Sequence, residues 1–208
     1  AVVTSRHVSS KRGDSSGGGS IVYESTRRRL TGKQAETVAR LAEATVKVLR
    51  KQEFSGLTVR SVAAEAGVGT ATAYTYFASK EHLVAEVFWR RLQNSSAPDG
   101  SGLDRTAHVL SVLRNIALLL ADEPEVSAAV TNALLGSDPE VEHLRGRIGL
   151  EIHQRLASAL DPNGEPEVLE ALEMLYAGAL LRAGIGYGTY AQIAGRLEAS
   201  ALLILEKS

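Results

Sequence analysis

Apolar residues recur every three or four positions from residue 32 almost to the end of the chain, which is the spacing of helices that bury one face. In the first half, this pattern predicts helices over 32–51, 59–66, 70–77 and 79–92. No stretch alternates apolar and polar residues over the length of a useful β-strand. The sequence therefore predicts an all-α protein.

Cap and turn residues mark the ends of the short helices. Thr58 occupies an N-cap position, where its hydroxyl can accept a hydrogen bond from an otherwise unpaired backbone N–H. Gly67 ends the helix that follows, because glycine tolerates the left-handed backbone of a tight exit, and Val68 can fill the angle between two helices. Ser79 caps the next long helix. These signals are typical of a helix-turn-helix followed directly by a further helix.

The helix predicted over 70–77 has an outer face that is polar but uncharged. Ala73 and Phe77 lie on its inner side. The outer positions carry hydroxyl groups, at Thr70, Thr72, Tyr74, Thr75 and Tyr76. Such hydroxyls suit hydrogen bonds to DNA phosphates and base edges, so the pattern favours contact with nucleic acid.

The second half of the chain continues as helices. Amphipathic runs cover 104–121, 124–135 and 139–160, and a turn signal follows at 161–164. An apolar helix is predicted over 166–185 and a last helix over 191–206, separated by glycines at 184, 186 and 188. We predict three parts: a tail over 1–25, a DNA-binding domain over 26–78, and a helical body over 79–208.

Charge is unevenly divided between these parts, although the whole chain carries only −1. Up to Leu92 there are 15 Lys and Arg against 8 Asp and Glu, a net charge of +7. The remainder has 8 basic and 16 acidic residues, a net charge of −8. A basic head on an acidic body fits a protein that presents one end to DNA and keeps the other away from it.

The first 25 residues are rich in Ser and Gly and show no periodicity, so we expect disorder there. Three arginines follow, Arg27, Arg28 and Arg29. They form either a solvated basic run or an arm that reaches the minor groove or flanking phosphates. No apolar stretch suits a signal peptide or approaches the roughly 20 residues of a membrane span. The sequence therefore predicts a cytoplasmic protein without a membrane partner.

Catalytic motifs are missing from the sequence. There is no cysteine, which excludes thiol nucleophiles, disulfides and zinc–thiolate sites. The glycines at 184, 186 and 188 do not follow a strand, and no phosphate-binding GK[ST] loop occurs. His153 has no second ligand at metal spacing beyond nearby Glu151. We predict that the protein is not an enzyme and requires no metal or cofactor.

The segment from Leu57 to Leu83 resembles the DNA-binding head of the tetracycline-repressor (TetR) family of bacterial regulators. The resemblance rests on Thr58–Arg60 at a helix start, Ala66–Val68 at the turn, Tyr74, Tyr76 and Phe77 in the second helix, and Ser79–Glu81. Two places depart from the family pattern. Gly69 and Thr70 stand where a polar or basic pair is common, and Ala73 stands where a leucine is common. Fewer long side chains reach the groove, so the sequence does not indicate a base preference.

The resemblance implies contacts to a palindromic double-stranded DNA operator. It assigns a phosphate contact to Tyr74 and a phosphate clamp to Lys80, which lies at a helix N-terminus that attracts anions. Arg60 would contact a guanine or a phosphate, or else remain a solvated surface residue. The predicted contacts are Arg27, Arg28, Arg29, Thr58, Arg60, Gly69, Thr70, Thr72, Tyr74, Thr75, Tyr76 and Lys80.

The resemblance also implies that the last two helices pair with those of a second copy in a four-helix bundle. Both helices are rich in apolar residues, and a helix that is apolar on two faces must bury both. We predict a homodimer interface made by Leu172, Tyr176, Ala179, Leu180, Ala183, Ile193, Leu197, Ala201 and Ile204. A second stripe carries Met174, Gly178, Leu181 and Ile185. The alternative is that one broad stripe is simply the core of a single protomer.

A ligand pocket is the other expected use of the body. The predicted lining is Phe88, Trp89, Ile116, Leu120, Val130, Leu134, Leu150, His153, Met174 and Arg182. A lining that is mainly aliphatic and aromatic suits a small hydrophobic effector. The stretch from Tyr176 to Leu205 is similar to regulators of lipid or sterol catabolism in actinobacteria, which implies a lipid- or sterol-related effector. Arg182 interrupts an apolar helix, and we favour an acidic partner or an outward orientation over contact with an anionic ligand.

Two functions remain. The first is a ligand-responsive transcriptional repressor that binds its operator as a homodimer and releases it when an effector shifts the helix over 79–92. The second is a helical small-molecule-binding protein or enzyme whose basic head mediates protein contacts. The hydroxyl-rich helix and the charge of the head favour the first.

Overall fold

The computed structural model describes residues 24–25, 28–29, 32–160 and 165–206. Over these ranges the chain forms nine α-helices and one two-stranded hairpin. Glu24–Ser25 (β1) and Arg28–Arg29 (β2) pair antiparallel, with Glu24 opposite Arg29. The prediction of an all-α fold is confirmed, because a hairpin of two-residue strands adds no sheet to the core. Most of the predicted tail lies outside the described residues.

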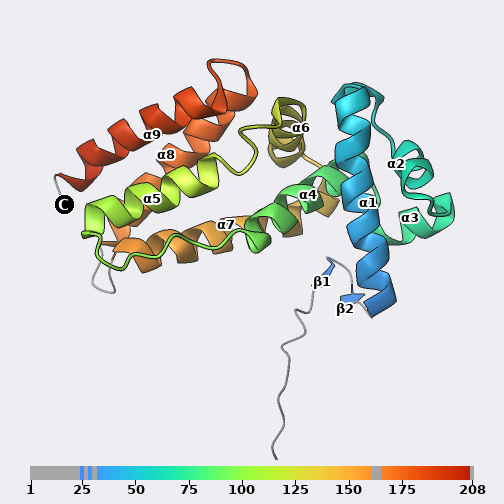
Figure 1. Cartoon of the computed structure of the whole chain (residues 1–208), viewed down its shortest axis with the longest axis horizontal. Helices are drawn as coiled ribbons and strands as arrows, with labels where there is room; N and C mark the ends of the chain where they lie inside the picture. Colours follow the sequence, from blue (N-terminus) through green and yellow to red (C-terminus); the bar gives the residue numbers. More distant parts are fainter. Residues whose placement is uncertain (1–23, 26–27, 30–31, 161–164, 207–208) are drawn as a thin grey trace, which may run out of the picture.

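The head consists of α1 (Gly32–Lys51), α2 (Val59–Ala66) and α3 (Thr70–Tyr76). In Figure 1, α1 crosses one end of the molecule and α2 and α3 lie on its outer side. A one-turn 3₁₀-helix, Phe54–Gly56, lies in the loop between α1 and α2. Apolar faces of the three helices bury Leu41, Val62 and Ala73 completely. The head thus has a dense core of its own, and α3 lies at its periphery.

The body consists of α4 (Lys80–Asn94), α5 (Arg105–Ala117), α6 (Pro124–Leu135), α7 (Pro139–Leu160), α8 (Pro166–Gly184) and α9 (Tyr190–Leu205). Figure 1 shows α4 leading from the head into the body, with α7 running along it and α5, α8 and α9 at the end far from the head. Leu83, Val84 and Ala85 of α4 are fully buried. Because α4 packs against α1 on one side and against α6 and α7 on the other, a single apolar core runs through both parts.

The helix predicted over 104–121 is shorter in the structure, where α5 ends at Ala117. The next residues form tight turns, in which the backbone N–H of Ala121 bonds to the carbonyl of Leu118 at 3.1 Å. The hydroxyl of Ser127 donates to the carbonyl of Leu120 at 2.6 Å. This hydrogen bond ties the turn to α6, so the chain makes a corner where sequence periodicity alone predicts one more helical turn.

The predicted dimer stripe requires correction. Seven of its nine residues are buried inside the protomer: Leu172, Tyr176, Ala179, Ala183, Ile193, Leu197 and Ala201. The other two, Leu180 and Ile204, are half-buried. The reason is that α9 packs against both α8 and α5, so its most apolar side faces the protomer core. These residues therefore belong mainly to the core of a single protomer, which is the alternative that the sequence left open.

A different set of apolar side chains lies on the outside of the last two helices. Met174, Leu181, Ile185 and Leu203 are 64%, 40%, 58% and 63% exposed. Gly178 and Gly195 lie on the same two helices and are also exposed. We call these six residues the outer face of α8 and α9.

Candidate nucleic-acid interface and body cavity

The turn between α2 and α3 is fixed by hydrogen bonds at both ends of α2. The hydroxyl of Thr58 accepts from the backbone N–H of Ser61 at 3.0 Å, and the hydroxyl of Ser61 accepts from the N–H of Thr58 at 3.1 Å. This reciprocal capping box satisfies two donors that a helix start leaves unpaired. At the other end, Gly67 adopts a left-handed φ of 61°. The guanidinium of Arg40 from α1 donates to the carbonyls of Ala66 and Gly67, at 2.5 Å and 3.2 Å. The predicted caps are confirmed.

The outer surface of α3 presents hydroxyl groups to solvent. Buried Ala73 and Phe77 anchor the helix to the head. On the opposite side Tyr74 is 50% exposed, and Thr72 and Thr75 are also exposed. The predicted residues Thr58, Arg60 and Gly69 are exposed around this helix, whereas Thr70 and Tyr76 are half-buried. The structure thus brings this part of the predicted set to one end of the head.

Lys80, predicted to bind a DNA phosphate, contacts Phe54 of the head. Its ammonium group donates to the carbonyl of Phe54 at 3.1 Å and lies 4.5 Å from the centre of the Phe54 ring. An ammonium group has three N–H donors, so two remain for a phosphate. Of the predicted arginine arm, Arg27 lies outside the described residues, and only the backbone of Arg28 and Arg29 is described.

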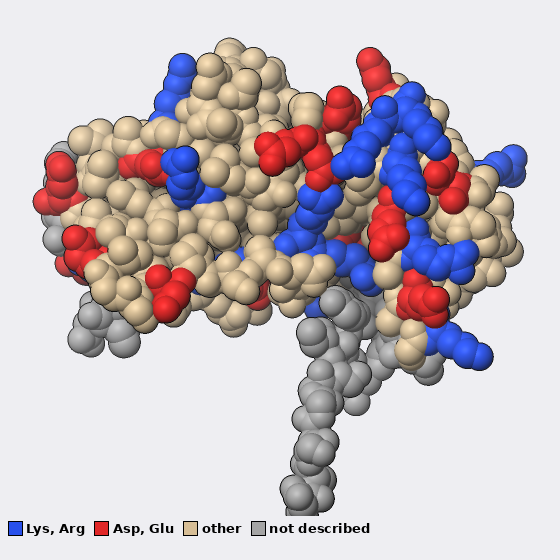
Figure 2. Space-filling view, in the orientation of Figure 1, with Lys and Arg blue, Asp and Glu red and all other residues tan. Residues whose placement is uncertain are grey.

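Basic side chains are concentrated on the head. Figure 2 shows Lys and Arg gathered over the head and its junction with the body, while most of the same face of the body carries neither charge. Helix α1 alone contributes Lys33, Arg40, Lys47, Arg50 and Lys51. The concentration of basic residues near the head that the sequence indicates is therefore also visible in space (Figure 2).

The body contains a cavity of about 180 Å³ enclosed by α4, α5, α6, α8 and the start of α9. We call it the body cavity. Its walls are almost entirely apolar. It is lined by Phe88, Ile116, Ala117, Leu120, Ser127, Val130, Thr131, Leu134, Leu135, Ala177, Leu180, Leu181 and Tyr190. Five of these, Phe88, Ile116, Leu120, Val130 and Leu134, belong to the predicted lining.

The other five predicted lining residues lie elsewhere. Leu150 and His153 line an open groove beside α7, where His153 Nδ1 lies 2.7 Å from a carboxylate oxygen of Glu173. Met174 and Arg182 line a groove between α8 and α9 on the outside of the body. The guanidinium carbon of Arg182 lies 5.1 Å from the centre of the Tyr187 ring, and the side chain is exposed. This agrees with the outward orientation that was one of the two explanations favoured from the sequence.

Trp89 is buried but lies away from the body cavity. The guanidinium carbon of Arg147 lies 4.4 Å from the centre of its ring. Consecutive side chains on α4 therefore face different surroundings, Phe88 the cavity and Trp89 helix α7.

Sequence reasoning missed the polar part of the cavity wall. Ser127 and Thr131 of α6 are four residues apart and share one face, while Tyr190 begins α9. The hydroxyl of Thr131 lies 3.3 Å from that of Tyr190. The spacing of Ser127, Thr131 and Leu135 could have suggested a common face, but no local signal joins it to Tyr190.

A carboxylate connects the cavity helix to the head. Glu123 immediately precedes α6, and its oxygens pair with Arg50 of α1 at 3.0 Å and with Arg91 of α4. Burial alone would raise the pKa of Glu123, but the hydrogen bonds and charges of Arg91 and Arg50 outweigh it and lower the pKa below its ordinary value. Three helices therefore meet at one carboxylate.

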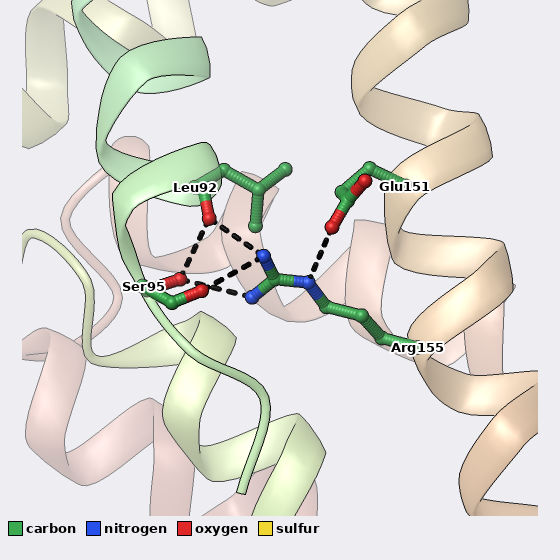
Figure 3. Close-up of polar contacts among 4 residues, drawn as sticks. All are labelled: Leu92, Ser95, Glu151 and Arg155. Atoms are coloured by element: carbon green, nitrogen blue, oxygen red, sulfur yellow. Dashed lines mark hydrogen bonds and ion pairs between the residues drawn. The ribbon is translucent and has the colours of Figure 1, made fainter. Parts of the chain in front are cut away.

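Arg155 of α7 holds the end of α4 in the body (Figure 3). Its guanidinium donates to the carbonyl of Leu92 at 2.6 Å, to the carbonyl and hydroxyl of Ser95 at 3.0 Å and 2.9 Å, and to Glu151 at 2.8 Å. The last carbonyls of a helix lack partners within it, so this side chain acts as a cap supplied by another helix.

A metal-binding cluster of three or more His, Cys, Asp or Glu side chains is absent from residues 32–160 and 165–206. Within the described part of the chain, none of the helices is long and apolar enough to cross a membrane.

Comparisons with known proteins agree with this geometry. Residues 41–87 match the family model described as "Bacterial regulatory proteins, tetR family". An uncharacterized HTH-type transcriptional regulator of Mycobacterium tuberculosis is 46% identical over 167 residues, which are 79% of this chain and 78% of that protein. The HTH-type transcriptional repressor KstR of Rhodococcus jostii is 25% identical over 129 residues, 61% of each chain. The crystal structure of a TetR transcriptional regulator from Rhodococcus sp. RHA1 superposes with a TM-score of 0.72 at 21% identity, covering 86% of this chain and 99% of that one.

Proposed function

Because the chain belongs to the TetR family of bacterial regulatory proteins, we propose that it is a ligand-responsive repressor that binds a palindromic operator as a homodimer. It is a DNA-binding transcriptional regulator with a helix-turn-helix head, and not an enzyme. In our proposal a hydrophobic molecule enters the body cavity and releases the operator. The similarity to a protein named as a repressor supports repression over activation. Such a protein acts in the cytoplasm, where bacterial DNA lies.

DNA reading in this proposal falls to α3. Its exposed hydroxyls can donate to and accept from phosphates and base edges, and the basic residues of α1 add attraction for the backbone. A recognition helix of this kind enters the major groove, and a dimer places two of them on half-sites one helical turn, or a multiple of it, apart. The predicted contacts at Thr72, Tyr74 and Thr75 are supported by their exposure.

The homodimer would form through the outer face of α8 and α9. This face is apolar and exposed in the single chain, which is unusual for a surface without a partner. A Cβ atom added to Gly178 or Gly195 would meet nothing within 4 Å in the described part of the chain. Glycine inside a helix costs roughly 0.5–1 kcal/mol relative to alanine, and no contact within the protomer accounts for it. Close approach of a partner helix would account for both the exposed apolar side chains and the two glycines.

One observation carries the proposal of ligand response: the helices that line the body cavity also hold the head. Phe88 of α4 lies on the cavity wall, and α4 continues from the head. Helix α6 supplies five further lining residues and begins at Glu123, which binds Arg50 of α1. A ligand that moves α4 or α6 therefore changes the position of the head, and with it the fit to two half-sites.

Tyr74 provides a test of DNA binding. Replacing Tyr74 by alanine is expected to weaken binding to a duplex selected by the unaltered protein by about 1–3 kcal/mol, because a phosphate hydrogen bond is lost. Fluorescence anisotropy at fixed salt measures this. The matched control is Tyr187→Ala, since Tyr187 is an exposed tyrosine of the body. Equal affinities of the two variants would argue against the assignment of α3 to DNA.

Glu123 provides a test of the junction. Replacing Glu123 by glutamine is expected to lower the free energy of unfolding by about 1 kcal/mol at pH 7, because two ion pairs are lost. The folded-state pKa lies below the ordinary value of 4.5, so this stabilisation is present at neutral pH and is lost as the pH falls through the folded-state pKa.

Urea unfolding of both proteins between pH 7 and pH 3 measures the effect of Glu123. The difference between them should stay constant above pH 6 and shrink in acid. The control is Glu198→Gln, which removes a carboxylate that pairs with Arg114 away from the junction. A difference that grows on acidification would contradict the lowered pKa.

A further inference from the structure

The hydroxyl groups of Ser127 and Thr131 on the wall of the body cavity already donate their hydrogens within the protein, so they can only accept hydrogen bonds from a ligand. Ser127 donates its hydroxyl hydrogen to the carbonyl of Leu120 at 2.6 Å. Thr131 donates its own to the carbonyl of Ser127 at 3.1 Å. A hydroxyl has one hydrogen and two lone pairs, so both oxygens can now only accept.

The same reasoning fixes the direction of the contact between Thr131 and Tyr190. Their oxygens are 3.3 Å apart, and either could be the donor by distance alone. Because the hydrogen of Thr131 is already used, Tyr190 must donate to Thr131. The chain then runs from Tyr190 to Thr131 to the carbonyl of Ser127, and its open end is a phenol oxygen with a free lone pair. That end accepts a hydrogen bond from a ligand.

The two groups are held in place from three helices. Tyr190 is the first residue of α9, which begins with a capping box between Thr189 and Gln192. Gly184, at the end of α8, lies so close to Thr131 that a Cβ atom there would overlap the threonine side chain. The acceptor pair is therefore positioned before any ligand arrives, which limits the entropy lost on binding.

The rest of the cavity restricts charge and size. None of its lining residues is charged, among those that the structure describes. Transfer of an ionised group into such surroundings is strongly unfavourable without a partner. The volume of about 180 Å³ is only slightly larger than the roughly 150 Å³ cavity that takes up benzene, and lies below the ~300 Å³ of pockets for drug-sized ligands. One ring fits this volume.

We infer that the effector is an uncharged, ring-sized apolar molecule with one hydroxyl group, which donates its hydrogen to the Tyr190–Thr131 pair. This inference rests on the proposed function and specifies the chemistry of its ligand. An alcohol or phenol presents a donor to acceptors. A ketone of the same shape has only a hydrogen-bond acceptor, which cannot bond to the acceptor oxygens of Tyr190 and Thr131. A carboxylate would bring a charge into a cavity that offers it no partner.

Three matched ring compounds test the inference by isothermal titration calorimetry on the full chain without DNA. Cyclohexanol is expected to bind about tenfold more tightly than cyclohexanone, the factor of one net hydrogen bond. Cyclohexanecarboxylate is expected to give no measurable heat of binding. Equal or reversed affinities of the alcohol and the ketone, or absence of binding by all three, would overturn the inference.

Conservative variants locate the contact. Tyr190→Phe should reduce the affinity for cyclohexanol about tenfold, to that of the ketone, and leave the affinity for the ketone unchanged. Thr131→Val keeps the phenol oxygen and frees its hydrogen to donate, so it should raise the affinity for the ketone about tenfold and remove the preference for the alcohol. Thr131→Ser keeps the hydroxyl and should keep the preference, which separates recognition from any loss of folding. The matched control is Tyr187→Phe, on an exposed ring outside the cavity. Unchanged binding of the alcohol by Tyr190→Phe, or an unchanged preference for the alcohol in Thr131→Val, would overturn the assignment.

A parallel titration of the operator complex separates this inference from the proposed function. Release of DNA by cyclohexanone or the carboxylate at lower concentrations than cyclohexanol would support regulation and overturn the ligand class. Binding of cyclohexanol with the predicted preference, but without release of DNA, would retain the ligand class and overturn ligand-driven release.

Discussion

Replacing Arg155 by alanine is expected to lower the free energy of unfolding by about 3–5 kcal/mol, because one buried guanidinium supplies four hydrogen bonds. The side chain is only 8% exposed, so water cannot take its place at the carbonyls of Leu92 and Ser95. For a chain of this size, the loss corresponds to a fall in melting temperature of roughly 6–20 °C. Differential scanning calorimetry measures it directly.

Two further variants show whether charge or geometry matters at position 155. Arg155→Lys keeps the charge but cannot span four acceptors, so it should fall between the alanine variant and the unaltered protein. Arg182→Ala removes an exposed arginine and should change the stability by no more than about 0.5 kcal/mol. If Arg155→Ala melts as Arg182→Ala does, the end of α4 is not held by this side chain.

The double replacement of Met174 and Leu203 by glutamate is expected to convert the protein from dimer to monomer. Each side chain is more than 60% exposed in the single chain, and a dimer through the outer face of α8 and α9 would bury four unpaired carboxylates. Operator affinity should then fall at least about 100-fold, because each half-site is bound separately. Light scattering reports the assembly, and anisotropy with the selected duplex reports DNA binding.

The control for this pair is Leu103→Glu. Leu103 is 45% exposed and lies in the loop before α5, so this substitution adds a charge away from the proposed interface. This variant should remain a dimer with unchanged DNA affinity. A stable dimer of the Met174 and Leu203 double variant would move the interface to another surface.

Most of the fold could be predicted because its boundaries depend on local chemistry. Helices α1, α6 and α7 begin and end where the sequence predicts, at positions marked by proline, glycine or the end of an apolar repeat. The caps at Thr58 and Ser79 form as expected, since each needs only a hydroxyl and a backbone N–H three residues on.

The choice of which apolar stripe faces inward could not be predicted. Helix α8 is apolar on two sides, so its periodicity does not distinguish the core from the outer face. The packing of α5 against α9 decides it, and that contact joins segments about 80 residues apart. The cavity shows the same limit: its aliphatic wall was partly foreseen, but the Tyr190–Thr131 pair brings together residues 59 positions apart.

The continuous core through α4 makes head and body a single cooperative folding unit. Leu83 and Leu92 are both fully buried, the first near the head and the second near the far end of α4. The predicted division at residue 78 does not mark a boundary in this apolar core. A head cut from the chain there would lose the helix that α1 packs against and would expose the apolar surface that α4 covers. Heat or denaturant should therefore unfold both parts in one transition, so the proposed DNA-binding surface persists only as long as the core of the body does.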